Sequence, residues 1–329
     1  MISVSLIGLT CILVLLILLA MKIVNKINIS TKEKTEDIIK FLYKQSEDNQ
    51  KTNLETIFLF SKISPKKLIN IIQNLFREKI IEYDQENITL TSKGKYIAGQ
   101  IIQKHRNIEK YLFENTSTVV EEIHKIAEKE EHKEFNKEDN TYDCVDPHGD
   151  IIVGEKPICY TLSSIQTNLI YKIIHIEDEP EEIYKKIVDL DLAPFDYIKT
   201  LQISSEYIKI LTNKGQIIKL DPILFSNIYV CQEQDAEIQK FFEEIEQNIS
   251  NITTLDKLKI NEKAKIIGIS FYIRGEQKRR LLELGISRNS IIQPVYNNML
   301  GDDPRVYKIR NTLLALRKEQ SKKIYVQKI

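Results

Sequence analysis

The sequence predicts a multidomain α+β protein that begins with a transmembrane helix. Three observations predict this fold class. The first 21 residues carry no charge, the next part alternates between helix-like and strand-like patterns, and the second half contains two β-rich blocks that resemble each other. At roughly 100–200 residues per domain, a chain of 329 residues holds several folded units.

The apolar N-terminal segment, residues 1–24, is long enough to cross a bilayer as one helix, which takes about 20 residues. Lys22 and Lys26 follow the uncharged stretch of residues 1–21, so the positive-inside rule puts the rest of the chain in the cytoplasm. We therefore expect a single-pass protein of the cell inner or cytoplasmic membrane with its soluble domains cytoplasmic. The alternative is a mis-assigned start codon that adds an upstream apolar stretch.

Residues 32–94 have the element order of a winged helix-turn-helix domain. Apolar residues at helical spacing predict three helices, and a polar tip between two apolar runs predicts a hairpin after them. These elements are Thr35–Lys44, Leu54–Ser61, Pro65–Glu78 and, for the hairpin, Ile80–Leu90.

The third of these helices is the candidate DNA-recognition helix. Opposite its apolar face it carries Lys66, Lys67, Asn70, Gln73 and Asn74. Lysine neutralises phosphates, whereas asparagine pairs bidentately with adenine and so confers base choice. For any single lysine the alternative is plain solvation. The expected partner is a double-stranded DNA operator.

The charge distribution agrees with two separate tasks. The whole chain has 47 basic and 47 acidic residues, but Lys22–Leu112 has 17 against 11 and Phe113–Tyr160 has 5 against 13. A basic block suits polyanions and an acidic block suits cations. The net charge of zero is therefore no argument against nucleic-acid binding, while 42% hydrophobic residues exclude wholesale disorder.

Residues 95–156 are expected to form a helical domain that binds metal. Its two long amphipathic helices are Lys95–Phe113 and Val119–Phe135. The second helix carries His124, Glu128, Glu131 and His132 on one stripe, and the first carries His105 and Glu109 one turn apart. Imidazole and carboxylate without thiolate suit Fe²⁺ or Mn²⁺. A solvated, charged helix face is the alternative.

Two β-rich blocks of similar pattern follow, Thr161–Val230 and Thr254–Val326, joined by an acidic helix within Gln232–Asn251. The four cysteines form no CxxC pair, so the sequence supports neither a disulfide framework nor a zinc ribbon. A glycine-rich phosphate loop and a nucleophile elbow are also missing from the sequence. We therefore do not expect an enzyme.

Three motifs together resemble the diphtheria toxin repressor/manganese transport regulator (DtxR/MntR) family. They are Lys104-His105-Arg106-Asn107-Ile108-Glu109, then His124-x3-Glu128-x2-Glu131-His132, then Pro147-His148-Gly149-Asp150. The resemblance covers roughly residues 32–154. It implies a homodimeric winged-helix repressor of metal-uptake genes that a divalent metal activates.

Residue by residue, the resemblance implies two metal sites. The primary site would consist of Asp37, Glu128, Glu131 and His132, and the second site of His105, Glu109 and His124. His175 and Asp178 are further candidates for the second site, and a strand histidine beside a charged turn is the alternative for them. Lys40 stands where the manganese regulators have a glutamate ligand, which argues against a binuclear manganese site.

The last block, residues 252–329, resembles FeoA, the small SH3-like barrel of ferrous-iron uptake systems. The resemblance rests on Arg279-Arg280-Leu281-Leu282-Glu283-Leu284-Gly285-Ile286, Gly301-Asp302-Asp303-Pro304 and Leu314-Ala315-Leu316-Arg317-Lys318-Glu319. Residues 160–231 would be a degenerate second copy. The full expected order is therefore a membrane helix, a winged helix, a helical domain and two SH3-like (FeoA-type) β-barrels.

The expected function is a membrane-tethered, DNA-binding transcriptional regulator, a repressor of metal-uptake genes that depends on Fe²⁺ or Mn²⁺. The alternative is a membrane-bound FeoA-like accessory or sensor protein that docks on a ferrous-iron transporter and does not bind DNA.

Overall fold

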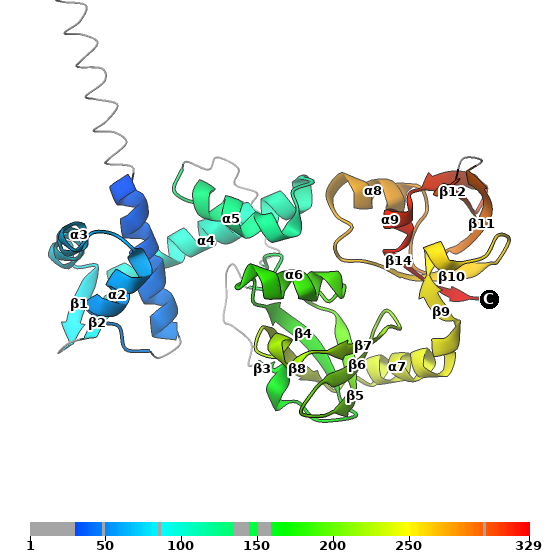
Figure 1. The fold of residues 1–329 in the computed structure, drawn as a ribbon, viewed down its shortest axis with the longest axis horizontal. Helices are drawn as coiled ribbons and strands as arrows, with labels where there is room; N and C mark the ends of the chain where they lie inside the picture. The colour runs from blue at the N-terminus through cyan, green and yellow to red at the C-terminus, as the bar shows by residue number, and fades with distance from the viewer. Residues whose placement is uncertain (1–29, 48–49, 85–86, 134–144, 151–158, 299–300) are drawn as a thin grey trace, which may run out of the picture. The chain divides into compact units, whose positions relative to one another are not determined.

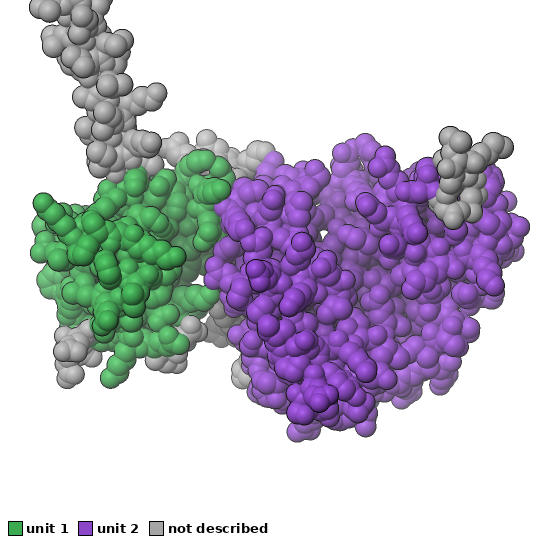
Figure 2. Space-filling model, viewed as in Figure 1, with its two compact units in different colours: residues 1–105, 128–138 green, residues 106–127, 139–329 purple. Residues whose placement is uncertain are grey.

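A computed structural model describes residues 30–47, 50–84, 87–133, 145–150, 159–298 and 301–329 (Figure 1). The chain divides into two compact units (Figure 2). Unit 1 comprises Met1–His105 with Glu128–Glu138, and unit 2 comprises Arg106–Ala127 with Asp139–Ile329. The division runs through the two long helices of the middle of the chain.

Unit 1 has the predicted winged-helix order. A first helix covers residues 30–47, and the following elements are α2 (Leu54–Ser61), α3 (Pro65–Arg77), β1 (Ile81–Asp84), β2 (Asn87–Leu90) and α4 (Ser92–Asn115). The bounds of α2 are those predicted, because Asn53 and Thr56 form a capping box at its start. The antiparallel hairpin of β1 and β2 follows α3.

The core of this unit fixes which face of α3 is exposed. Leu68, Ile71, Ile72 and Leu75 are buried at 3–4 spacing, together with Ile57 of α2. The apolar stripe therefore faces the core, and the opposite stripe of α3 faces solvent.

Helix α5 (Val120–Glu130) is shorter than the predicted Val119–Phe135. Glu131 and His132 follow it in a turn, and residues 134–144 lie outside the described part of the chain. The predicted stripe of four ligands on one continuous helix is therefore interrupted after Glu130.

Unit 2 contains the remaining parts of α4 and α5 and two six-stranded antiparallel sheets. The first sheet consists of β3 (Tyr160–Thr161), β4 (Ile170–Ile176), β5 (Tyr197–Ile203), β6 (Ile208–Thr212), β7 (Ile217–Leu220) and β8 (Ile228–Glu233), with α6 (Glu181–Asp189) between β4 and β5. The second consists of β9 (Ile252–Thr254), β10 (Ala264–Ile269), β11 (Ile291–Asn298), β12 (Gly301–Ile309), β13 (Thr312–Leu316) and β14 (Ile324–Lys328), with α8 (Gly275–Glu283) between β10 and β11 and α9 (Lys318–Ser321) before β14. Helix α7 (Ala236–Asn248) joins the two sheets where the acidic helix was predicted.

The two sheets share one topology, which supports the predicted repeat. Their strand orders are β3-β8-β4-β5-β6-β7 and β9-β14-β10-β11-β12-β13. In each sheet the last strand therefore lies between the first and the second, and one helix follows the second strand. Closure of either sheet into an SH3-like barrel stays a prediction.

The predicted membrane localisation has to be corrected. Within the described ranges, no helix combines the length and the apolar character that a bilayer crossing requires. The expected anchor, residues 1–24, lies outside the described residues.

Candidate metal centres and DNA-binding surface

Unit 1 brings together acidic and histidine side chains from the first helix and from the turn after α5. Donor atoms of Asp37, Glu131 and His132 all lie within 4.8 Å of one another. Nε2 of His132 lies 3.2 Å from Oδ1 of Asp37, and its Nδ1 lies 2.6 Å from Oε2 of Glu36. We call Glu36, Asp37, Glu131 and His132 the first cluster.

The electrostatics of the first cluster favour charged forms. Hydrogen bonds with Asp37 and Glu36 raise the pKa of the His132 imidazole to about 9, against the effect of burial. Burial alone would raise the pKa of Glu131, but the hydrogen bond with His105 and the charge of Lys40 outweigh it and lower this pKa below its usual value. The cluster therefore holds ionised carboxylates next to one another, as a cation site does.

One predicted ligand of the primary site lies outside the first cluster. Glu128 is exposed in the last turn of α5 and is not part of the first cluster, whereas Glu36, which sequence reasoning missed, is. His105 is buried, and its Nδ1 lies 2.5 Å from Oε2 of Glu131. Glu36 directly precedes Asp37 in the sequence, and this position next to a predicted ligand is the feature by which Glu36 could have been found.

A tight loop in unit 2 carries a histidine that sequence reasoning did not choose as a ligand. Oδ1 of Asp146 accepts hydrogen bonds from the backbone N–H groups of His148 and Asp150, each at 2.9 Å. Gly149 has φ +93, and a Cβ there would lie 2.0 Å from the carbonyl oxygen of Ile174 in β4. The glycine thus allows the loop to lie directly against β4, which fixes His148.

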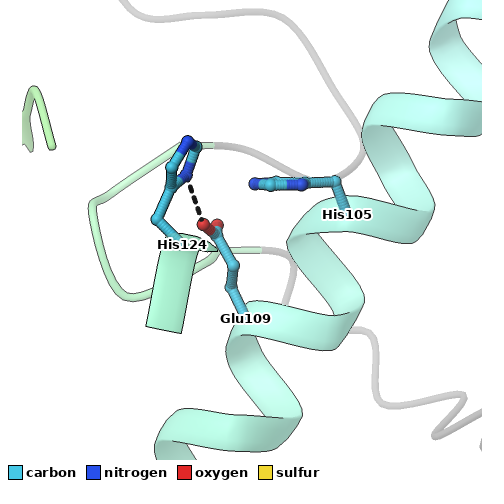
Figure 3. A group of neighbouring side chains, drawn as sticks. All are labelled: His105, Glu109 and His124. Carbon is cyan, nitrogen blue, oxygen red and sulfur yellow. Dashed lines mark hydrogen bonds and ion pairs between the residues drawn. The ribbon is translucent and has the colours of Figure 1, made fainter. Parts of the chain in front are cut away.

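His148 lies next to a second group of candidate ligands, which consists of Glu109, His124 and Asp178. Nδ1 of His124 lies 3.0 Å from Oε1 of Glu109 (Figure 3) and 2.8 Å from Oδ2 of Asp178. Nε2 of His148 lies 3.7 Å and 3.5 Å from the same two oxygens. We call these four residues the second cluster. His105 lies one turn before Glu109 on α4 (Figure 3).

The donor set of the second cluster fits a divalent metal. Among the described residues, neither ring nitrogen of the buried His148 has a hydrogen-bond partner, and an unsatisfied buried imidazole is costly unless a ligand completes it. Hydrogen bonds with Asp178 and Glu109 outweigh burial and raise the pKa of His124 to about 11. The interaction with His148 and the hydrogen bond with His124 outweigh burial and lower the pKa of the Asp178 carboxyl to about 2. Carboxylates and imidazoles without thiolate suit Mn²⁺ and Fe²⁺ in both clusters.

Of the two further candidates, only Asp178 lies in the second cluster. Nδ1 of His175 lies 3.4 Å from Asp150 and its Nε2 lies 3.6 Å from Glu177. His175 lies in β4 and Asp178 lies two residues after its end, so the alternation of side chains along the strand does not place the two on one face. Burial opposes protonation of His175, but Glu177 and Asp150 outweigh it and raise its pKa.

The candidate DNA-binding residues divide into an exposed set and one partly buried lysine. Lys66, Asn70, Gln73 and Asn74 are exposed on α3. Lys67 is half-buried, and its Nζ donates to the hydroxyl of Ser30 at 3.5 Å. The exposed set forms one polar face, which suits a groove of DNA.

Two family models match parts of this chain. Residues 91–135 match the iron dependent repressor, metal binding and dimerisation domain, and residues 253–328 match the FeoA domain. Each of these two matches covers less than half of the chain. No curated protein matches the chain significantly.

Several solved structures align with about 60% of this chain. A manganese-dependent transcriptional repressor in complex with manganese aligns with a TM-score of 0.55 and 18% identity, over 60% of this chain and 100% of that one. The manganese regulator SloR (24% identity, TM-score 0.47) covers 60% of this chain and 98% of its own. IdeR of T. acidophilum aligns with 19% identity and a TM-score of 0.45, over 61% of this chain and 97% of that one. The first of these likenesses shows a shared fold.

Proposed function

We propose that this protein is a homodimeric, DNA-binding transcriptional repressor that a divalent metal, Mn²⁺ or Fe²⁺, activates, and that it controls metal-uptake genes. The observation that carries the proposal is the first cluster. Its residues come from two segments of unit 1: Glu36 and Asp37 from the first helix, and Glu131 and His132 from the turn after α5.

Metal in the first cluster would connect the winged helix to the end of α5. Asp37, Glu131 and His132 would hold the ion, and Glu36 would orient His132 through its other ring nitrogen. A bound divalent ion supplies a positive charge that neutralises these carboxylates. Because only the state with the full ligand set binds the ion well, the ion selects that state.

The experiment that tests this function measures DNA binding by the full-length chain with and without metal. Double-stranded oligonucleotides selected from a random library in the presence of Mn²⁺ or Fe²⁺ supply the operator. We expect sequence-selective binding that requires one of these ions and is lost with a chelator. Failure to select any sequence with either ion would contradict the proposal and favour the FeoA-like accessory role, for which the match of residues 253–328 speaks.

Asn70 is expected to be a base-reading residue. Its side chain is exposed on α3, and a bidentate contact to adenine is worth about 1–3 kcal/mol of discrimination. Asn70→Ala should therefore lower affinity for the selected operator and flatten the preference at one base pair. Lys66 lies on the same face and is expected to contact a phosphate. Lys66→Ala should therefore weaken binding to all sequences alike and reduce the salt dependence of binding. Equal effects of both variants on all sequences would contradict base reading by Asn70.

His148 is expected to be a ligand of the second cluster. His148→Ala should reduce the number of Mn²⁺ ions bound per chain or weaken one of them by about 10–100-fold or more, because it removes a buried imidazole whose ring nitrogens form no hydrogen bond among the described residues. The matched variant is His175→Ala, whose ring nitrogens face Asp150 and Glu177. Isothermal titration distinguishes the two, and a larger effect of His175→Ala would overturn the assignment of His148.

A further inference from the structure

Lys40 places a positive charge inside the first cluster. It lies one turn after Glu36 and Asp37 on the helix of residues 30–47. Its Nζ donates to both carboxylate oxygens of Glu131, at 2.8 Å each. Only 1% of the Glu131 side chain and 23% of the Lys40 side chain is exposed, so this ion pair is largely shielded from water.

The contacts of Glu131 show how its oxygens are used. A carboxylate has about four lone-pair positions and can bind two cations at once. Here the ammonium of Lys40 contacts both oxygens, and His105 contacts Oε2 as well. An ammonium only donates hydrogen bonds, so it cannot serve as a metal ligand. Lys40 therefore occupies a position next to Glu131 that a second divalent ion would otherwise take.

We propose that Lys40 is a built-in cation of the first cluster: it restricts the cluster to one divalent ion and weakens the binding of that ion. This inference rests on the proposed metal-binding function of the cluster. Lys40 thus controls both the number of ions that bind and the affinity of the first cluster. Because Lys40 lowers this affinity, a higher metal concentration is needed to fill the cluster.

Charge repulsion gives the expected size of the effect. A single and a double positive charge about 5 Å apart repel each other enough, even with the dielectric constant of water, to change an affinity on the order of tenfold. Shielding from water increases such an interaction. The neutral variant Lys40→Gln should therefore bind Mn²⁺ at the first cluster at least about tenfold more tightly.

The test measures Mn²⁺ binding to the full-length chain by equilibrium dialysis and titration calorimetry, in a His148→Ala background that weakens the second cluster. Lys40→Gln is expected to keep one ion and bind it more tightly, and Lys40→Glu is expected to bind one additional ion. Lys44→Gln is the matched control, because Lys44 is exposed one turn further along the same helix. Thermal unfolding without metal checks that each variant is folded.

The outcomes separate this inference from the proposed function. If Lys40→Gln binds Mn²⁺ no more tightly than Lys44→Gln, the inference is wrong even where wild type binds metal normally. If wild type binds no Mn²⁺ in the first cluster, the proposed function itself fails. Should Lys40→Glu not fold, the affinity of Lys40→Gln alone decides.

Discussion

Glu131→Gln is expected to abolish metal binding at the first cluster. The carboxylate of Glu131 is buried and lies within 4.8 Å of donor atoms of Asp37 and His132. The amide keeps the shape of the side chain but removes the charge that a divalent ion requires. Since loss of a residue that only supports a metal ligand costs about 10–100-fold in affinity, loss of a ligand should cost at least that much. Metal-dependent DNA binding should disappear with it.

Two further variants make this result specific. Glu131 also neutralises Lys40, and breaking a buried ion pair destabilises a fold by about 3–5 kcal/mol. Asp37 belongs to the same cluster but pairs with Lys34, whereas Lys40 pairs with Glu131. Asp37→Asn should therefore give the same loss of Mn²⁺ binding without breaking the pair of Lys40 and Glu131. Glu130→Gln, a change at the neighbouring exposed residue that pairs with Lys133, is the control. Unchanged Mn²⁺ affinity in both Glu131→Gln and Asp37→Asn would remove the first cluster as a metal site.

The sequence predicted the winged helix well because its pattern is local. Helix α2 has the predicted bounds, and α3 ends one residue before the predicted end. In α3 each buried residue recurs at helical spacing, so the core face could be read directly from the order of residues. The exposed face with Asn70 followed from the same pattern.

The metal clusters were less predictable because they depend on contacts between distant segments. A stripe that includes Glu128 and His132 assumes a continuous helix, but α5 ends at Glu130. Glu131 and His132 then lie in a turn, where helical spacing no longer says which side chains share a face. His148 reaches the second cluster through a loop that packs on β4, and no spacing along the chain encodes such a contact.

The affinity of the first cluster for Mn²⁺ should rise steeply with pH. The pKa of His132 is raised from 6.5 to about 9 in the metal-free protein, so this imidazole is protonated at pH 7. A histidine has to be neutral to bind a metal ion, so each ion that binds must displace this proton. Below the raised pKa, affinity therefore increases about tenfold per pH unit, or about 100-fold from pH 6.5 to pH 8.5.

The same shift has the opposite sign for the stability of the metal-free fold. Protonated His132 stabilises the folded state fully below about pH 6.5, and this contribution is lost as the pH rises through about 9. Metal replaces the proton in just this range, so Mn²⁺ should raise the melting temperature more at pH 8.5 than at pH 6.5.

Calorimetry in buffers of different ionisation enthalpy measures the protons released. With the second cluster weakened by His148→Ala, we expect close to one proton per Mn²⁺ at pH 7, and an affinity that levels off as the pH approaches 9. His132→Ala should release no such proton and should bind Mn²⁺ weakly at every pH. A wild-type affinity that is independent of pH between 6.5 and 8.5 would show that His132 is not a ligand, and the ion would then have to be held by the carboxylates alone.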